Sequence, residues 1–159
     1  MNENKILLVD DEPSVLNSLE RVFADEDYEI FKADSGEDAL KVLAKEKIKL
    51  IISDERMPGM KGSQLLSMVA LQHPQVVRIT LTGHASIDAA MKALNEGEIF
   101  RFMLKPWNNF ELLMAVRAGI EKYDIEMKNR MLLAKLRTQE LQIQKAERLS
   151  PGITVLDQG

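Results

Sequence analysis

Residues 5–20 read KILLVDDEPSVLNSLE, and this short stretch already indicates the fold class. The apolar run Ile6–Val9 is typical of a strand that is buried on both faces. An acidic turn follows it, and Ser14 after Pro13 is a signal for the start of a helix. Leu16 and Leu19 next recur at the spacing of one helix face. A buried strand that leads through a short loop into an amphipathic helix predicts a βαβ unit and therefore a parallel sheet.

The same alternation continues along the chain. Four further apolar runs are predicted as strands: Glu29–Ala33, Leu50–Ser53, Val76–Leu81 and Ile99–Leu104. The segments between them have helical periodicity, and helix N-caps are predicted at Ser14, Ser35, Ser86 and Asn109. Because crossovers between parallel strands are right-handed, we expect a doubly wound, five-stranded parallel sheet covered by helices on both faces.

The last predicted helix is longer than a small domain requires. From Asn109 to about Leu149 there is no proline and one glycine, so the helix would extend roughly 60 Å at 1.5 Å per residue. We expect a compact domain over residues 1–122, a helical extension over 123–149 and a flexible tail over 150–159. The extension has a thin apolar stripe interrupted by two polar residues: Ile125, Asn129, Leu132, Leu136, Gln139, Ile143 and Ala146. This weak heptad spacing predicts a coiled coil and a homodimer through the C-terminal helix.

Composition excludes several classes of protein. The 159 residues include no cysteine, so a disulfide framework and a thiolate metal site are excluded. The net charge of −4 provides no basic field for direct nucleic-acid binding. No apolar run is long enough to cross a membrane, and the first residues do not resemble a signal peptide. We therefore expect a cytoplasmic protein without membrane contact.

Polar residues cluster where the predicted strands end. Asp10 and Asp11 follow the first strand, Asp54 the third, Thr82 the fourth and Lys105 the fifth. Ligands of open parallel sheets bind at these carboxyl ends. Three neighbouring carboxylates repel one another, and a Mg²⁺ ion with oxygen ligands would remove that cost. A carboxylate held there can act as a nucleophile towards phosphorus, so these residue types fit phosphoryl transfer.

Four motifs in order then carry a family resemblance: VDDEP at 9–13, SDERMPGMKG at 53–62, LTGHA at 81–85 and FMLKPW at 102–107. Over residues 3–122 the chain resembles the receiver domain of two-component response regulators, of which chemotaxis regulators are an example. The resemblance implies a flavodoxin-like sheet with strand order 2-1-3-4-5. It also implies a partner, a histidine kinase or phosphotransfer protein, that donates a phosphoryl group from a phosphohistidine.

The resemblance assigns the acidic residues individual roles. Asp54 matches the phosphoacceptor. Asp11 and Asp54 match direct Mg²⁺ ligands, together with the backbone carbonyl of Arg56, and Asp10 matches an acidic residue that helps through water.

Other family positions match residues that sense or support the phosphoryl group. Thr82 matches a hydroxyl that moves towards the acyl phosphate, Lys105 an ammonium that pairs with it, and Phe102 an aromatic that turns inward on activation. Supporting positions fall on Pro106, often preceded by a cis bond, and on Pro58 and Gly62. Arg56 and His84 occupy the variable positions that tune the lifetime of the acyl phosphate.

The resulting expectation is a phosphorylation-dependent signalling switch that catalyses only its own phosphorylation and dephosphorylation. Its output surface would be the face made by the fourth helix, the fifth strand and the fifth helix. Receivers with this fifth-strand motif resemble those fused to HD-GYP phosphodiesterase, nucleotide cyclase or kinase modules, and the end at Gly159 suggests that an output domain is absent from this chain.

Three alternatives remain at this point. One is a receiver used for docking or dimerisation without phosphorylation. Another is a haloacid-dehalogenase-like phosphatase, although that family places a second Asp where Arg56 stands. The third is a flavodoxin-like nucleotide binder, although the loop after the first strand has no phosphate-cradling Gly, Ser or Thr.

Overall fold

The structure, a computed structural model, describes residues 3–84 and 86–149. Its strands are β1 (Lys5–Val9), β2 (Glu29–Ala33), β3 (Leu50–Ser53), β4 (Val77–Thr82) and β5 (Arg101–Leu104). Its helices are α1 (Pro13–Val22), α2 (Gly36–Lys45), α3 (Gly62–Gln72), α4 (Ile87–Asn95) and α5 (Asn109–Leu149). The strands match the predicted runs to within two residues at each end.

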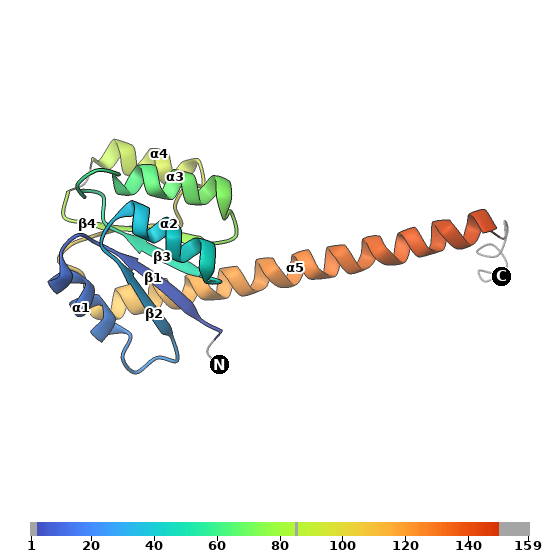
Figure 1. Cartoon of the computed structure of the whole chain (residues 1–159), viewed down its shortest axis with the longest axis horizontal. Coiled ribbons are helices and arrows are strands. Elements are labelled where there is room, and N and C mark those ends of the chain that lie inside the picture. The colour runs from blue at the N-terminus through green and yellow to red at the C-terminus, as the bar shows by residue number, and fades with distance from the viewer. Residues whose placement is uncertain (1–2, 85, 150–159) are drawn as a thin grey trace. The chain divides into compact units, whose positions relative to one another are not determined.

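The five strands form one parallel sheet in the order β2-β1-β3-β4-β5. Helices α2, α3 and α4 lie on one face, and α1 and the first part of α5 lie on the other (Figure 1). This arrangement confirms the predicted doubly wound sheet and its strand order. Gly119 allows α5 to lie close to the sheet, because a Cβ atom there would be 2.5 Å from Leu50 Cδ1.

Strands β1 and β3 are buried along almost their whole length. In β3 all four residues are buried, and in β1 only Lys5 at its start is partly exposed. Successive side chains of a strand point to opposite faces, so a continuously apolar strand supplies two cores. Leu7 and Ile51 belong to the core cluster that also contains Leu65 of α3. The rigid centre of the sheet therefore carries the loops that follow β1 and β3.

Two of the four predicted helix caps are confirmed. The prediction of Ser14 was wrong, because α1 begins at Pro13 and its N-cap residue is Glu12. Ser35 Oγ accepts a hydrogen bond from the Asp38 backbone N–H, and Ser86 Oγ accepts one from Ala89. The prediction of Asn109 as the cap of α5 was wrong, since Asn108 Oδ1 accepts from the Glu111 backbone N–H at 3.0 Å. Adjacent asparagines are equivalent by propensity, and only the path of the chain after β5 selects one of them.

The chain divides into two units, Met1–Tyr123 and Asp124–Gly159. In the described part of the second unit, every apolar residue of the predicted stripe is exposed or partly exposed, and the four large ones are Ile125, Leu132, Leu136 and Ile143. Within residues 3–84 and 86–149, no helix is both long and apolar enough to cross a membrane. The tail predicted for residues 150–159 lies outside the described residues.

Candidate functional site

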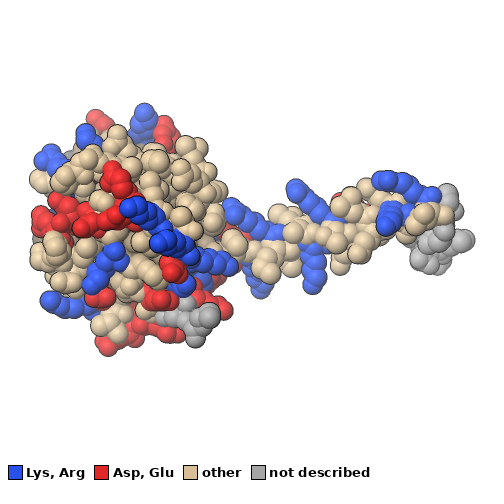
Figure 2. Space-filling view, viewed as in Figure 1, with Lys and Arg blue, Asp and Glu red and all other residues tan. Residues whose placement is uncertain are grey.

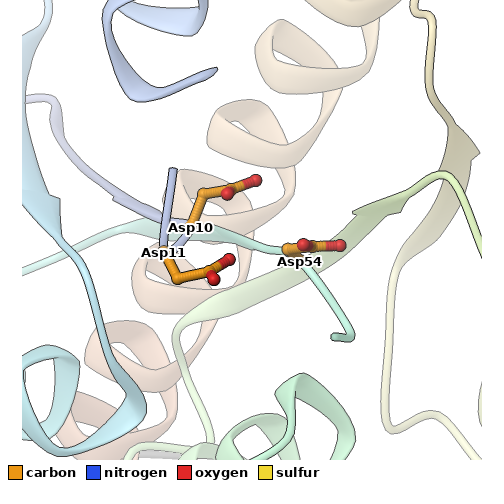
Figure 3. A group of neighbouring side chains, drawn as sticks. All are labelled: Asp10, Asp11 and Asp54. Atoms are coloured by element: carbon orange, nitrogen blue, oxygen red, sulfur yellow. The ribbon is translucent and has the colours of Figure 1, made fainter. Parts of the chain in front are cut away.

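The carboxyl ends of β1 and β3 bring three aspartates together. Backbone hydrogen bonds continue beyond the strands, from Asp10 N to Ala33 O at 3.2 Å and from Asp54 N to Val9 O at 3.0 Å. These bonds hold the two loops in the register of the sheet. One carboxylate oxygen from each of Asp10, Asp11 and Asp54 lies within 4.8 Å of the other two. Figure 3 shows Asp10 and Asp11 extending from the end of β1 towards the side of Asp54.

Lys105 brings a positive charge to this group from the end of β5. Its Nζ atom lies 2.7 Å from Asp10 Oδ2 and 3.5 Å from Asp54 Oδ2. Burial lowers the pKa of Lys105, but the hydrogen bond and charge of Asp10, with a smaller contribution from Asp54, raise it further, so the net pKa lies above the ordinary value. The ammonium is therefore charged at neutral pH and positioned between two buried carboxylates.

Asp54 is buried but keeps one carboxylate oxygen directed towards the cluster. Its Oδ1 accepts a hydrogen bond from the Glu55 backbone N–H at 2.8 Å, while Oδ2 is the atom that faces Lys105. Asp10 is occupied at both oxygens, because Oδ1 accepts from the Glu12 backbone N–H and Oδ2 from Lys105. Of the two buried aspartates, Asp54 is thus the one with a weakly engaged oxygen, since Oδ2 has only the 3.5 Å contact with Lys105 among the contacts described here.

The donor set suits a small, hard cation. Three carboxylates face one ammonium, so the cluster has an excess of negative charge that a divalent ion would neutralise. Mg²⁺ prefers oxygen ligands and binds through one or two carboxylates plus waters. Asp11, which is the most exposed of the three aspartates, and Asp54 could coordinate such an ion directly, since their oxygens are close enough to share it.

The loop after Asp54 is held by a close approach of two backbones. A Cβ atom at Gly62 would lie 1.9 Å from the carbonyl oxygen of Asp54, so only glycine fits there. Gly59 has φ +77°, a left-handed conformation that follows the exposed Pro58. Ser63 Oγ donates to Glu55 Oε1 at 2.7 Å and ties the loop to the first turn of α3. These contacts fix the backbone that follows the Asp54 carboxylate.

Thr82 lies at the end of β4, with no exposed surface. Its Oγ1 accepts a hydrogen bond from the His84 backbone N–H at 3.2 Å, and its carbonyl accepts one from Lys105 N at 2.9 Å. The next peptide bond, Lys105–Pro106, is cis. The ends of β4 and β5 are thus joined directly, which places the hydroxyl and the ammonium on adjacent strands.

A cavity of about 630 Å³ adjoins these residues. Its lining includes Arg56 and His84, the two positions expected to tune the phosphoryl lifetime, and Phe102. Phe102 is half-buried and packs against the core cluster. The cavity therefore connects the loops after β3 and β4 to the aromatic of β5.

Comparison with known proteins agrees with this geometry. The sequence-family model of the response regulator receiver domain matches residues 6–117 of this chain. The chain belongs to this receiver family. Membership favours the receiver interpretation over the phosphatase and the nucleotide binder.

The individual relatives of this receiver have different names and come from different organisms. The transcriptional regulatory protein GlrR of Escherichia coli is 38% identical over 117 residues, which is 74% of this chain and 26% of that protein. The crystal structure of an adenylate cyclase from Rhodopirellula baltica matches 85% of this chain and 99% of that chain, with 39% identity and a TM-score of 0.79. The signal receiver domain of an HD domain-containing protein from Pseudomonas fluorescens Pf-5 matches 76% and 97%, with 37% identity and a TM-score of 0.72. The chain spans about a quarter of the length of the curated relatives it matches.

Sequence reasoning missed two features of the receiver site. It assigned Lys105 to the acyl phosphate and Asp10 to a water-mediated role, and it did not foresee that these two residues pair with each other. It also overlooked Glu55, whose carboxylate accepts hydrogen bonds from both the backbone N–H and the hydroxyl of Ser63. The signal that could have revealed the Glu55 contact was Ser63, a hydroxyl residue at the second position of the predicted third helix, directly after Gly62.

Proposed function

We propose that this receiver is a phosphorylation-dependent signalling switch that accepts a phosphoryl group on Asp54. The observation that carries the proposal is the position of Asp54 Oδ2. It is buried beside two further carboxylates and lies 3.5 Å from the ammonium of Lys105. A nucleophilic oxygen and a positive charge are thereby directed at the same small volume, as phosphoryl transfer requires.

The proposed donor is a phosphohistidine of a histidine kinase or phosphotransfer protein. An oxygen of Asp54 forms a bond to phosphorus while the phosphorus–nitrogen bond to the histidine breaks, and the released imidazole nitrogen takes up a proton. Lys105 neutralises charge on the phosphoryl oxygens. The chain acts on its own phosphoryl group alone, so we propose no separate metabolic substrate.

Magnesium completes the proposed site. Asp11, Asp54 and the backbone carbonyl of Arg56 would hold Mg²⁺, and Asp10 would contact it through water. The ion supplies charge neutralisation for the transferring group. Asp10 also holds Lys105 in place through the 2.7 Å ion pair, so it positions the ammonium before any phosphoryl group arrives.

The proposed output of the switch is a change at α4, β5 and α5. A phosphoryl group offers new acceptor oxygens to the Thr82 hydroxyl, which in this structure accepts from the His84 backbone N–H. If the hydroxyl rotates towards the phosphoryl group, the loop after β4 loses that contact. Phe102 lines the adjacent cavity and is half-buried, so it has space to rotate inward. Arg56 and His84 line the same cavity and would set access of water to the acyl phosphate.

The wider setting follows from the same proposal. We propose that the receiver works in the cytoplasm, forms a homodimer through the helix beyond Tyr123, and controls an output module. The three relatives are named as a transcriptional regulator, an adenylate cyclase and an HD domain-containing protein, and so the proposal does not specify the activity of the output module. The homodimer is supported by the exposed apolar stripe of the second unit.

The decisive experiment is intact-mass analysis after incubation with acetyl phosphate and Mg²⁺. We expect a gain of one phosphoryl group, roughly 80 Da, in the wild-type chain and none in Asp54→Asn. Asp34→Asn is the matched control, because Asp34 is an exposed aspartate that follows β2 at the same edge of the sheet. Undiminished labelling of Asp54→Asn would refute the assignment. No labelling of the wild type by acetyl phosphate or by any of a panel of kinases would favour a docking module that works without phosphorylation.

A further inference from the structure

One heptad frame of the helical segment 124–149 places four of its large exposed apolar residues at a and d positions, whereas Met131, Leu133, Leu141 and Leu149 lie at other positions. In this frame the a positions are Asn129, Leu136 and Ile143, and the d positions are Ile125, Leu132, Gln139 and Ala146. The four large apolar members are 50–60% exposed although they belong to one helix face. A stripe of only a and d residues is the narrow seam of a coiled coil and not the wider face of a helix that packs on a globular core.

Charges flank this seam unequally. The g positions, one residue before each a position, are Lys128, Lys135 and Gln142, and the e positions, one residue after each d position, are Glu126, Leu133, Glu140 and Glu147. No g position in this segment is acidic, and no e position is basic. In Figure 2 basic and uncharged side chains dominate the visible side of this segment.

We propose that two copies of this chain associate through residues 124–149 as a parallel, in-register, two-stranded coiled coil. This inference rests on the proposed homodimer and adds its orientation, its register and its contacts. The occupant of the stripe is a second copy because the same residues supply both halves of the seam. Only the orientation decides whether the flanking charges attract or repel.

In the parallel arrangement each g position faces the e position five residues later in the other chain. Lys135 then pairs with Glu140 of the partner chain, and the two-fold symmetry produces this ion pair twice. In an antiparallel arrangement g faces g and e faces e, so lysine would face lysine and glutamate would face glutamate. The charge pattern therefore favours parallel strands whatever the exact antiparallel register. Glu121, the g position nearest the receiver, would face Glu126 of the partner, so the favourable part of the seam begins after Glu126.

The two polar core residues are consistent with the in-register arrangement. Asn129 then faces Asn129 of the partner, and Gln139 faces Gln139, so each amide can bond to its own copy. A shift of one heptad would set Asn129 against Leu136 and leave an amide without a polar partner. A single asparagine at an a position is a well-attested device for fixing register. Both polar layers weaken the seam, and so we expect a dimer that dissociates on dilution.

The absence of cysteine makes orientation directly testable in the full chain. Ile125→Cys and Ile143→Cys place one thiol near each end of the seam. In parallel, in-register strands each variant forms its own disulfide dimer under mild oxidation. A mixture of the two forms no mixed dimer, because the sites would be about 27 Å apart along the helix. Arg130→Cys and Arg137→Cys, at outward b positions, are the controls and should stay uncrosslinked.

A charge exchange tests the proposed ion pair. Lys135→Glu should raise the dimer dissociation constant about three- to tenfold, and Lys135→Glu combined with Glu140→Lys should restore it. In an antiparallel dimer Lys135→Glu would not weaken association, because it replaces a lysine pair by a glutamate pair where residue 135 faces residue 135, and creates an attraction where it faces Lys128. Sedimentation equilibrium measures both, with acetyl-phosphate labelling of each variant followed in parallel.

The outcomes separate this inference from the proposal on which it rests. Mixed disulfides alone, or a Lys135→Glu variant that associates at least as tightly as the wild type, would overturn the parallel orientation while leaving the homodimer intact. A wild-type chain that stays monomeric at high micromolar concentration would overturn both orientation and homodimer. In either case labelling of Asp54 decides the switch proposal separately.

Discussion

Two leucines on two helices show how differently the two units of this chain are stabilised. Leu65 of α3 has no exposed surface and packs in the core cluster beside the central strands. Leu136 of α5, in the second unit, is 60% exposed. The receiver buries its apolar residues against its own sheet, whereas the segment 124–149 presents them to solvent.

This difference in burial implies that the receiver and the segment 124–149 have separate roles, one in phosphoryl transfer and the other in association. Asp54, the proposed phosphoacceptor, directly follows β3, a strand whose four residues are all buried, so its geometry does not depend on another chain. An isolated helix gains little from intrinsic propensity and needs a packing partner. We therefore expect changes in the receiver to alter folding and phosphoryl transfer, and changes in the segment to alter association alone.

The largest expected difference between the two units is the effect of truncating Leu65 or Leu136 on the free energy of unfolding. Leu65→Ala should lower the free energy of unfolding by about 3–5 kcal/mol, because it leaves a cavity in a packed core. Leu136→Ala should change the unfolding of the receiver by less than about 0.5 kcal/mol and should weaken the dimer instead. Chemical denaturation and sedimentation of both variants measure this contrast. Equal losses of stability would show that the segment is part of the folding unit.

Removal of the segment should abolish association and spare the site. A chain that ends at Tyr123 should be monomeric at concentrations where the 1–159 chain dimerises, both without and with beryllofluoride as a phosphoryl mimic. Its labelling at Asp54 should be unchanged, because every contact described at the site lies within the receiver. Sedimentation velocity and intact mass give the two readouts. A dimer that survives truncation would move the interface to the receiver itself.

Asp11→Ala should lower the affinity for Mg²⁺ about tenfold or more, equivalent to roughly 1.4 kcal/mol. The variant removes one of the two carboxylates proposed as direct ligands, and few protein ligands remain. Calorimetric titration measures the change, with Glu12→Ala as a neighbouring acidic control. An unchanged affinity in Asp11→Ala would place the ion elsewhere. The dimer of the same variant should be unaffected.

The smallest effect on the chemistry is expected at Thr82. Thr82→Ala retains Asp54 and Lys105, so the extent of labelling should change by less than about threefold. The response of β5 should be lost, since the hydroxyl is the proposed link between the phosphoryl group and Phe102. NMR shifts of Phe102 with and without beryllofluoride, compared in wild type and Thr82→Ala, measure that link. An identical response in the variant would remove Thr82 from the switch.

Local sequence patterns were sufficient for most of the fold. Continuous apolar runs such as Ile6–Val9 have no solvent-facing side, so they predict central strands, and the helical spacing between them leaves few alternatives to a parallel sheet. These patterns leave the order of the strands open, and the family resemblance supplied it. The predicted cap of α5 was wrong because the adjacent Asn108 and Asn109 have the same propensity for the N-cap position.

The candidate site was likewise predicted in part from the sequence and in part only from the structure. The sequence by itself determined which chemical groups stand at the strand ends, since residue type and strand boundary are local properties. Only the tertiary structure decided that Lys105 is nearest to Asp10, and that Gly62 must be glycine because the Asp54 carbonyl approaches it. Both depend on distances between segments that are remote along the chain, and a sequence pattern carries no such distances until the sheet sets the separation of its strands.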